Sequence, residues 1–197
     1  NSDLIEYGGD HVISNTNLSS DLSKKYNIVK DNYAFKVCRI EPENNIQLIL
    51  SAFSNSNYKL VIIGNWDNSL FGINLKSEYA KFENIIILDP IYDQNILDQF
   101  RANCKIYIHG HSVGGTNPSL VEAMNLGLCV FSYDVIYNRE TTENKAFYFS
   151  NKEDLIQLIN NPNLNIKKCS IEMFNIAKRR YSWKIICDKY FQAFNNL

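Results

Sequence analysis

Nearly continuous apolar runs alternate with stretches of helical period along this 197-residue chain. The apolar runs predict buried strands at residues 33–39, 58–64, 84–89, 105–110, 128–134 and 146–150. The amphipathic stretches predict helices at residues 43–53, 70–81, 93–103, 118–126, 152–160, 167–180 and 182–195. Buried strands that alternate with helices are typical of a parallel sheet covered on both faces, so we predict a doubly wound, Rossmann-like α/β fold.

The first 32 residues do not follow this alternation. Residues 4–13 (LIEYGGDHVI) are interpreted as a strand end and a Gly-Gly turn, and the polar residues 14–27 predict a loop. We therefore divide the chain into a lead-in segment at 1–32, a Rossmann-like domain at 33–181 and a C-terminal helix at 182–197. A Rossmann domain does not need such a lead-in, so we expect a further segment to precede it in the native gene.

Composition and charge narrow the classes of partner. The net charge is −1, so electrostatics does not favour a nucleic-acid partner, and the short basic run at 178–180 allows at most a weak attraction to an anionic membrane surface. The five cysteines form no C-x-x-C pair, which favours reduced core residues over a disulfide framework or a zinc site. No signal peptide is visible, and no apolar run approaches ~18 residues. We expect a cytoplasmic protein, at most peripheral to the inner face of the cell membrane.

The candidate chemistry lies in two loops. In a doubly wound sheet the ligand binds beyond the carboxyl ends of the strands, where the winding reverses. If the strand order is 3-2-1-4-5-6, the first and fourth strands flank that crevice. The loops that follow these strands are residues 39–45 (RIEPENN) and 109–119 (HGHSVGGTNPS), and we expect them to face each other.

The second loop has the features of an anion-binding site. Its glycines permit close backbone approach, and Asn117 and Pro118 are favoured residues at the start of a helix. The free N–H groups and the dipole at that helix start favour a phosphate group. We therefore predict a diphosphate-binding set that consists of Gly114, Gly115, Thr116, Asn117 and Ser119.

Two charged side chains complete the predicted site. Arg39 ends the first strand and offers a planar, permanent cation to a diphosphate, although an ion pair with Glu41 or Glu43 is the alternative. Glu122 lies four residues after Pro118, on the same face of the helix. A carboxylate there does not help a phosphate, but it accepts hydrogen bonds from two hydroxyls of a ribose.

Other motifs fit these residues less well. The spacing from Gly110 to Gly115 resembles a P-loop, but Thr116 stands where the lysine must be, and the first strand-to-helix turn lacks the glycines of a dinucleotide fingerprint. His109 and His111 have no third metal ligand nearby in the sequence, so we interpret them as side chains that line the crevice. A tight strand-to-helix turn without a ligand is the remaining alternative for the glycine pair.

The two loops also carry a family resemblance. Residues 107–124 (YIHGHSVGGTNPSLVEAM) and 38–45 (CRIEPENN) resemble the C-terminal, donor-binding half of GT-B glycosyltransferases. The resemblance is to the large retaining family with a Glu-x7-Glu motif, and within it to a bacterial rhamnosyltransferase-like subgroup. It covers nearly the whole chain, because residues 5–10 resemble the turn that leaves the interdomain linker and residues 181–194 the helix that crosses back to the N-terminal domain.

The resemblance implies site residues, and the sequence departs from the motif at one of them. The second Glu of the motif binds the ribose and matches Glu122, whereas the first contacts the transferred sugar and falls on Gly114. The backbone amides of residues 114–117 and the side chains of His109 and His111 are the candidates for holding the sugar instead.

The resemblance assigns two further contacts. The family's diphosphate-binding Arg and Lys match Arg39 and Asn44, so this chain keeps the arginine and lacks the lysine. The base usually meets the backbone after the third strand, which is Pro90 and Ile91 here.

The reaction implied by the resemblance is a metal-independent, retaining transfer from a nucleotide-diphosphate sugar, either UDP-linked hexose or N-acetylhexosamine or dTDP-rhamnose. Arg39 and Glu122 are then the catalytic residues, and the sequence agrees in having no Asp-x-Asp pair for a divalent ion. The resemblance places such enzymes in bacterial surface polysaccharide biosynthesis, O-antigen or capsule, with a lipid-linked glycan as acceptor. The acceptor-binding N-terminal domain is missing from this chain, so we expect no activity from it alone.

Two alternatives stay open. The first is a non-catalytic nucleotide- or sugar-binding Rossmann module, which the missing Glu and Lys favour. The second is another Rossmann enzyme, such as an epimerase or a dehydrogenase, and the glycine-free first strand-to-helix turn argues against it.

Overall fold

A single parallel sheet of six strands forms the centre of the molecule. The computed structural model describes residues 4–14 and 16–195. The strands are β1 (Tyr33–Val37), β2 (Lys59–Ile63), β3 (Ile85–Leu88), β4 (Ile106–His109), β5 (Cys129–Tyr133) and β6 (Phe147–Phe149). Their order is β3-β2-β1-β4-β5-β6, and every neighbouring pair is parallel. The predicted Rossmann-like fold and its strand order are confirmed.

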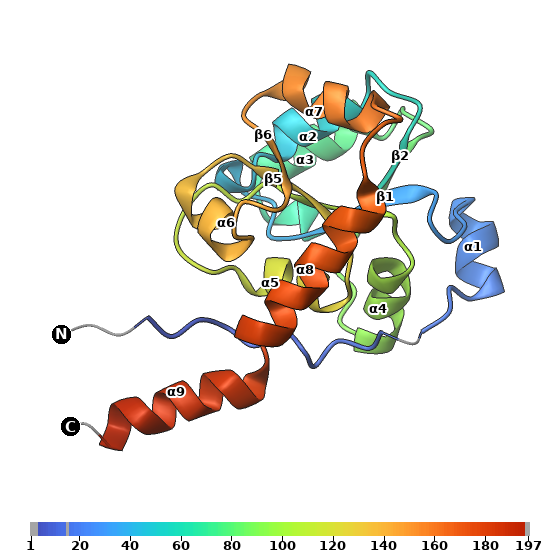
Figure 1. The fold of residues 1–197 in the computed structure, drawn as a ribbon. Coiled ribbons are helices and arrows are strands. Elements are labelled where there is room, and N and C mark those ends of the chain that lie inside the picture. Colours follow the sequence, from blue (N-terminus) through green and yellow to red (C-terminus); the bar gives the residue numbers. More distant parts are fainter. Residues whose placement is uncertain (1–3, 15, 196–197) are drawn as a thin grey trace.

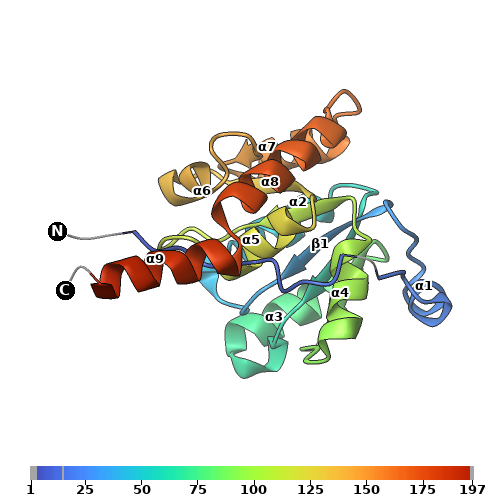
Figure 2. The same ribbon diagram turned by 60° about the horizontal axis from the view of Figure 1, so that its bottom comes forward.

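Helices cover both faces of the sheet (Figure 1). They are α1 (Ser20–Tyr26), α2 (Ile46–Phe53), α3 (Leu70–Tyr79), α4 (Gln94–Ala102), α5 (Pro118–Asn125), α6 (Ile136–Thr141), α7 (Lys152–Asn160), α8 (Ile166–Arg180) and α9 (Trp183–Asn195), with short 3₁₀ turns η1 (Pro42–Asn44) and η2 (Trp66–Asn68). Helix α9 extends away from the sheet beside the N-terminal segment (Figure 2). Helices α2, α3 and α7 lie on one side of the sheet, and α4 and α5 on the other (Figure 1). The chain therefore reverses its winding between β1 and β4, as the sequence predicts for the ligand crevice.

The strand pattern explains the two cores. Side chains alternate along β1, so Ala34 belongs to the apolar cluster that α2 and α3 cover, and Phe35 to the cluster that α1 and α4 cover. Phe35 lies opposite Tyr107 of β4 in the strand register, and their ring centroids are 6.3 Å apart. Because both faces are covered, the strands are nearly continuous in apolar residues, which is the signal that the sequence carries.

Two helices were not expected from the sequence. Helix α1 falls where the polar segment predicts a loop: Ser19 caps it by accepting a hydrogen bond from the backbone N–H of Leu22, and Asn27 ends it with a φ of 48°. Its apolar side chains, Leu22 and Tyr26, pack against the second core. Helix α6 follows β5 and is only six residues long.

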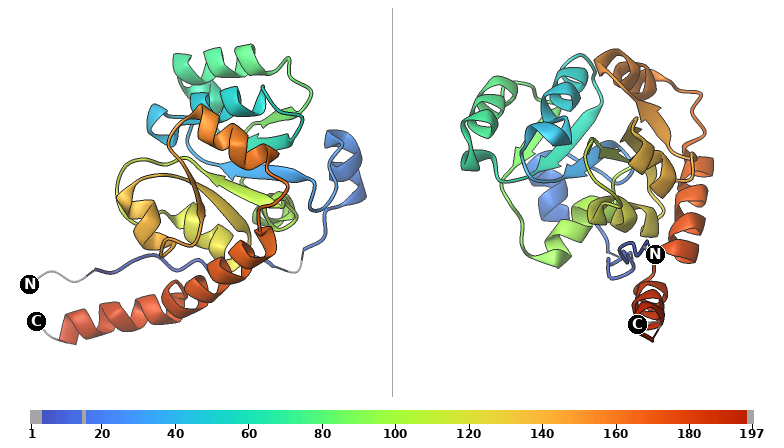
Figure 3. Two further views of the ribbon diagram at one scale, coloured as in Figure 1. Left: turned by 45° about the horizontal axis from the view of Figure 1, so that its top comes forward. Right: turned by 90° about the vertical axis from the view of Figure 1, so that its left-hand side faces the viewer.

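The lead-in segment lies across the end of α8 and along α4, and it pairs with no strand over residues 4–14. The strand end predicted for residues 4–13 is therefore wrong. The backbone N–H of Gly9 donates to the carbonyl of Tyr181 at 2.8 Å, and that of Ile13 donates to Oδ2 of Asp98 at 3.1 Å. Figure 3 shows the lead-in beside α9, where Asp10 accepts a hydrogen bond from the backbone of Trp183 at 2.8 Å.

The division into residues 1–32, 33–181 and 182–197 stays a prediction. The two outer segments are joined to each other as well as to the sheet domain, since Glu6 of the lead-in pairs with Lys189 of α9 and with Arg180 of α8. Among residues 4–14 and 16–195, no helix is both long enough and apolar enough to cross a lipid bilayer.

Candidate functional site

A crevice of about 330 Å³ opens between the carboxyl ends of β1 and β4. Its lining comes from the end of β1, η1, α4, the end of β4 and the first turns of α5: Lys36, Val37, Cys38, Arg39, Asn44, Arg101, His109, His111, Asn117, Pro118, Ser119 and Glu122. The two loops predicted to face each other therefore do so. Gly114, Gly115, Thr116, Pro90 and Ile91 do not line it.

The start of α5 forms one end of the crevice. Oδ1 of Asn117 accepts hydrogen bonds from the backbone N–H of Ser119 at 3.1 Å and from its hydroxyl at 2.8 Å, and Pro118 occupies the first helical position. The helix begins at the predicted residue because this cap and this proline are both present. The resulting helix end presents positive partial charge to the crevice.

The glycine pair is exposed in the loop between the crevice residues His111 and Asn117. Gly114 has a φ of +83°, which a glycine adopts without strain, and a Cβ added to Gly114 or to Gly115 would meet nothing within 4 Å. The loop is held lower down, where the backbone N–H and the hydroxyl of Ser112 both donate to the carbonyl of Glu43, at 2.9 and 3.0 Å. The glycines therefore leave open space above the start of α5.

Glu122 is held by a buried network. Its Oε2 lies 2.8 Å from Nη2 of Arg101, and its Oε1 lies 3.2 Å from Nε2 of His11. Arg101 is 3% exposed and pairs through Nη1 with Asp98, which is fully buried, at 2.9 Å. The carboxylate that the sequence assigns to a ribose is thus fixed in place, and each of its oxygens keeps a lone pair for a hydroxyl donor.

Arg39 lies at the open side of the crevice. Its side chain is 74% exposed, and Nη1 is 3.4 Å from Oε2 of Glu41. The ion pair with Glu41 is the alternative that the sequence left open, and it forms without removing Arg39 from the crevice lining. A pair this exposed contributes little to stability, so the guanidinium is free to turn to a bound anion.

Asn44 is tied into the fold. It is 5% exposed; its amide N–H donates to the carbonyl of Arg39 at 2.9 Å, and its Oδ1 lies 3.0 Å from Nδ1 of His111. The side chain that matches the family's lysine therefore joins the first loop to the second.

The two histidines differ in their surroundings. His109 is 2% exposed, and its Nε2 has no hydrogen-bond partner among the described residues. Burial and then the charge of Lys36 lower the pKa of His109 well below its usual value, and the same two causes lower the pKa of His111. Both imidazoles are therefore neutral near pH 7. Within the described part of the chain, no three His, Cys, Asp or Glu side chains gather as metal ligands.

Sequence reasoning missed two charged residues of the crevice. Lys36 is buried in the middle of β1, and a charge inside an apolar run was the available signal. Arg101 reaches the crevice from α4, and its pairing with Glu122 depends on the tertiary packing. His11 is remote in sequence from these residues, and the structure brings it to Glu122.

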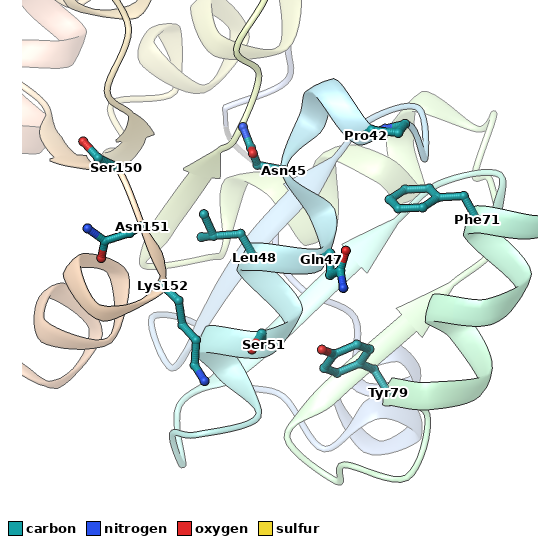
Figure 4. A pocket seen from close by; sticks show the side chains of 10 residues that line it. All are labelled: Pro42, Asn45, Gln47, Leu48, Ser51, Phe71, Tyr79, Ser150, Asn151 and Lys152. Carbon is teal, nitrogen blue, oxygen red and sulfur yellow. The ribbon is translucent and has the colours of Figure 1, made fainter.

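Another hollow, of about 470 Å³, lies between α2, α3 and the start of α7 (Figure 4). Side chains of α2, α3 and the turn before α7 surround it, among them Leu48, Phe71, Tyr79 and Lys152. Lys152 is its one charged side chain, and it brings together no set of acid, base and anion-binding groups. The smaller crevice, with its cations, neutral imidazoles and helix start, is therefore the candidate site.

Comparisons with known proteins identify a family and a fold. The family model described as "Glycosyl transferases group 1" matches residues 19–167. No curated protein sequence matches the chain. Sucrose-phosphate synthase from Thermosynechococcus elongatus superposes with a TM-score of 0.74 at 14% identity, over 92% of this chain and 49% of that one. HepE from Anabaena, solved with UDP and glucose, superposes with a TM-score of 0.77 at 14% identity, over 90% and 52%.

A third solved structure resembles this chain over nearly its full length. It is described as the C-terminal domain of a glycosyl transferase group 1 family protein, LpcC, from Francisella tularensis, and it superposes with a TM-score of 0.68 at 16% identity. The likeness covers 88% of this chain and 97% of that one. This chain thus spans about half the length of the two larger proteins and corresponds in fold to a separate C-terminal domain.

Proposed function

The chain belongs to the glycosyl transferases group 1 family, and we propose that it is the donor-binding half of a GT-B glycosyltransferase. The donor is a nucleoside-diphosphate sugar, either UDP-linked hexose or N-acetylhexosamine or dTDP-rhamnose. The observation that carries the proposal is the crevice at the winding reversal, whose lining brings together Arg39, the start of α5 and the fixed carboxylate of Glu122. Similar folds have been solved with UDP and with UDP-glucose.

The groups of the crevice suit the parts of such a donor. The start of α5 and Arg39 offer positive charge to the diphosphate, and Glu122 offers lone pairs to the ribose hydroxyls. His109 and His111, being neutral, are hydrogen-bonding groups for the sugar. Pro90 and Ile91, which lie outside the crevice lining, remain the proposed contacts of the base through their backbone.

We propose a retaining transfer that needs no divalent ion. The bond between the sugar carbon and the diphosphate breaks, and the departing oxygen gains negative charge that Arg39 and the start of α5 stabilise. The acceptor oxygen forms its bond to the same face of the sugar carbon, and its proton goes to the leaving diphosphate. No base from this half of the enzyme is then required.

The remaining parts of the enzyme are proposed to lie in a second, N-terminal half that binds the acceptor. Helix α9 supports this arrangement, because Phe191 and Phe194 are 69% and 71% exposed on it. We assign the enzyme to bacterial surface polysaccharide biosynthesis, O-antigen or capsule, on the cytoplasmic side of the membrane, with a lipid-linked glycan as acceptor. This assignment rests on the likeness of residues 107–124 and 38–45 to that subgroup.

A non-catalytic nucleotide- or sugar-binding module is the second candidate. Its specific support is Asn44, whose amide is used within the fold where the family has a lysine, together with Gly114 in place of the first motif Glu.

The first experiment is a calorimetric titration of the 197-residue chain with UDP, dTDP, GDP and NAD, first without metal and then with magnesium. We expect one nucleoside diphosphate to bind without metal and NAD not to bind. Preferential binding of NAD would contradict the proposal. A protein that contains both halves should then be assayed for glycosyl transfer. Activity supports the enzyme, and inactivity supports the non-catalytic module.

A further inference from the structure

Lys36 is a buried lysine that the proposed mechanism does not use. It lies in β1 and is 1% exposed, on the same face of the strand as Ala34 and Cys38. None of the ion pairs among the described residues includes Lys36. A buried ammonium without a counter-ion is costly, so burial favours the neutral amine of Lys36, and an anion bound beside it would favour the charged form.

The position of Lys36 links it to the crevice. Lys36 lines the crevice, and its charge contributes to the lowered pKa of both His109 and His111, which places the three side chains close together. Burial lowers the pKa of Lys36 itself, and the neighbouring Cys38 thiol acts in the opposite direction. The nearby carboxylates are taken, since Glu122 pairs with Arg101 and Glu41 with Arg39.

A buried group without a hydrogen-bond partner in the described part of the chain lines the same crevice. Nε2 of His109 is buried and has no hydrogen-bond partner among the described residues. The base of the crevice thus offers a lysine and a neutral imidazole, and the start of α5 adds its positive end. An anion with several oxygens interacts favourably with all three, whereas a neutral ligand does not stabilise the charged form of Lys36.

We propose that Lys36 is the second cation of the donor site and binds the diphosphate from the base of the crevice. The family's diphosphate-binding lysine matches Asn44, in the loop after β1. In this chain Lys36, within β1, would take the role of that lysine. This inference rests on the proposed function, and it goes beyond it by naming a residue outside the family's motif. Arg39 then holds the diphosphate from the solvent side, and Lys36 from the buried side.

The test compares Lys36→Met with Lys105→Met in the 197-residue chain. Methionine keeps the length of the side chain without its charge, and Lys105 is an exposed lysine just before β4, at the amino ends of the strands and away from the crevice at their carboxyl ends. Each protein is titrated with the nucleoside diphosphate that the wild type binds best among UDP, dTDP and GDP, and with the corresponding nucleoside as a phosphate-free probe. We expect Lys36→Met to lose about 10-fold to 100-fold in diphosphate affinity and nothing in nucleoside affinity. Lys105→Met should match the wild type with both probes.

Proton uptake provides a readout that does not depend on a substitution. At a mildly alkaline pH the diphosphate is already fully ionised, so protons taken up on binding go to protein groups. The groups that face Lys36 are Cys38, His109 and His111. A bound anion raises the pKa of Lys36 from its lowered value, so calorimetry in buffers of different ionisation enthalpy should show uptake by the wild type that falls in Lys36→Met.

The outcomes separate the two proposals. Equal diphosphate affinity of wild type and Lys36→Met, with no difference in proton uptake, removes Lys36 from the site and leaves the proposed function standing. If the wild type binds none of the three nucleoside diphosphates, both proposals fail for this chain. A loss with the nucleoside as large as that with the diphosphate shows a structural effect and also overturns the inference.

Discussion

The two walls of the crevice carry different kinds of groups. The β1 wall holds two basic side chains, Lys36 buried and Arg39 exposed. The wall formed by β4 and α5 holds neutral imidazoles and a carboxylate that Arg101 fixes from α4. Under the proposed function, the first wall supplies charged side chains for the phosphates, and the second supplies the helix start for the phosphates and hydrogen-bonding side chains for the hydroxyls.

The two walls also differ in how much their charged side chains contribute to the stability of the fold. Arg39 is exposed and pairs only with Glu41, so its removal should hardly affect stability. Arg101 is buried between Asp98 and Glu122, and its removal leaves a fully buried carboxylate without its cation. The ion pairs behind the wall formed by β4 and α5 therefore contribute to the stability of the fold, whereas Arg39 of the β1 wall contributes little to it.

The largest expected effect follows from this contrast. Arg101→Met should lower the free energy of unfolding by about 3–5 kcal/mol, because Asp98 is left buried and unpaired. Urea unfolding of the whole chain measures it. Arg179→Met is the matched control, since Arg179 pairs with Glu143 on the surface and should cost at most about 1 kcal/mol. Equal losses in the two variants would contradict the buried network.

A smaller effect is expected from Arg39→Ala, and on binding instead of stability. We expect the affinity for a nucleoside diphosphate to fall by about 10-fold to 100-fold, the value of a charge-assisted hydrogen bond, with unfolding unchanged within about 1 kcal/mol. Titration calorimetry measures the affinity. Unchanged affinity would remove Arg39 from the site.

Ionic strength sharpens the comparison between the two cations of the β1 wall. Salt screens an exposed charge more than a buried one. The affinity gap between wild type and Arg39→Ala should therefore narrow as salt is added, and the gap for Lys36→Met should narrow less. If the two affinity gaps narrow equally, salt screens both interactions with the diphosphate to the same extent, and Lys36 does not bind it from a buried position.

The next effect tests the other wall. Glu122→Gln keeps the shape of the side chain and removes its charge, so we expect it to weaken UDP binding by about 10-fold. Deoxy-UDP lacks one of the two ribose hydroxyls, and its affinity should fall less. The measurement is the fold-loss in affinity from wild type to Glu122→Gln, taken once with UDP and once with deoxy-UDP. Equal losses with the two nucleotides would contradict the assignment of Glu122 to the ribose.

The sequence predicts the positions of the strands and most helices because these depend on local patterns. Continuous apolar runs mark strands that are covered on both faces, and capping residues such as Asp93 and Asn117 mark the starts of α4 and α5. Helix α1 is not predicted by these local patterns, because only Leu22 and Tyr26 are apolar within a polar segment. These two side chains stabilise the helix only because the second core offers a surface on which they pack.

The residues of the candidate site are predictable from the sequence only where local patterns place them. Arg39, Asn117 and Glu122 follow strands or begin a helix, so their place in the crevice follows from the fold class. Arg101 is on the preceding helix and pairs with a residue 21 positions later, which no local pattern encodes. The burial of Lys36 is likewise a property of the packing around β1, although a lysine inside an apolar run is a visible exception.

The smallest effect concerns the glycine pair in the loop before α5, where backbone and not side chain is expected to matter. Gly114 has a φ of +83°, and Gly115 does not have a positive φ; a Cβ at either position meets nothing within 4 Å. Gly114→Ala should therefore cost about 1 kcal/mol of unfolding free energy through backbone strain, while Gly115→Ala should be neutral or slightly stabilising because it restricts the unfolded chain. Thermal unfolding of both variants measures this. A methyl group at Gly115 that leaves stability unchanged but weakens diphosphate binding would place the ligand against that backbone, since the space a bound diphosphate needs is the space the methyl would fill.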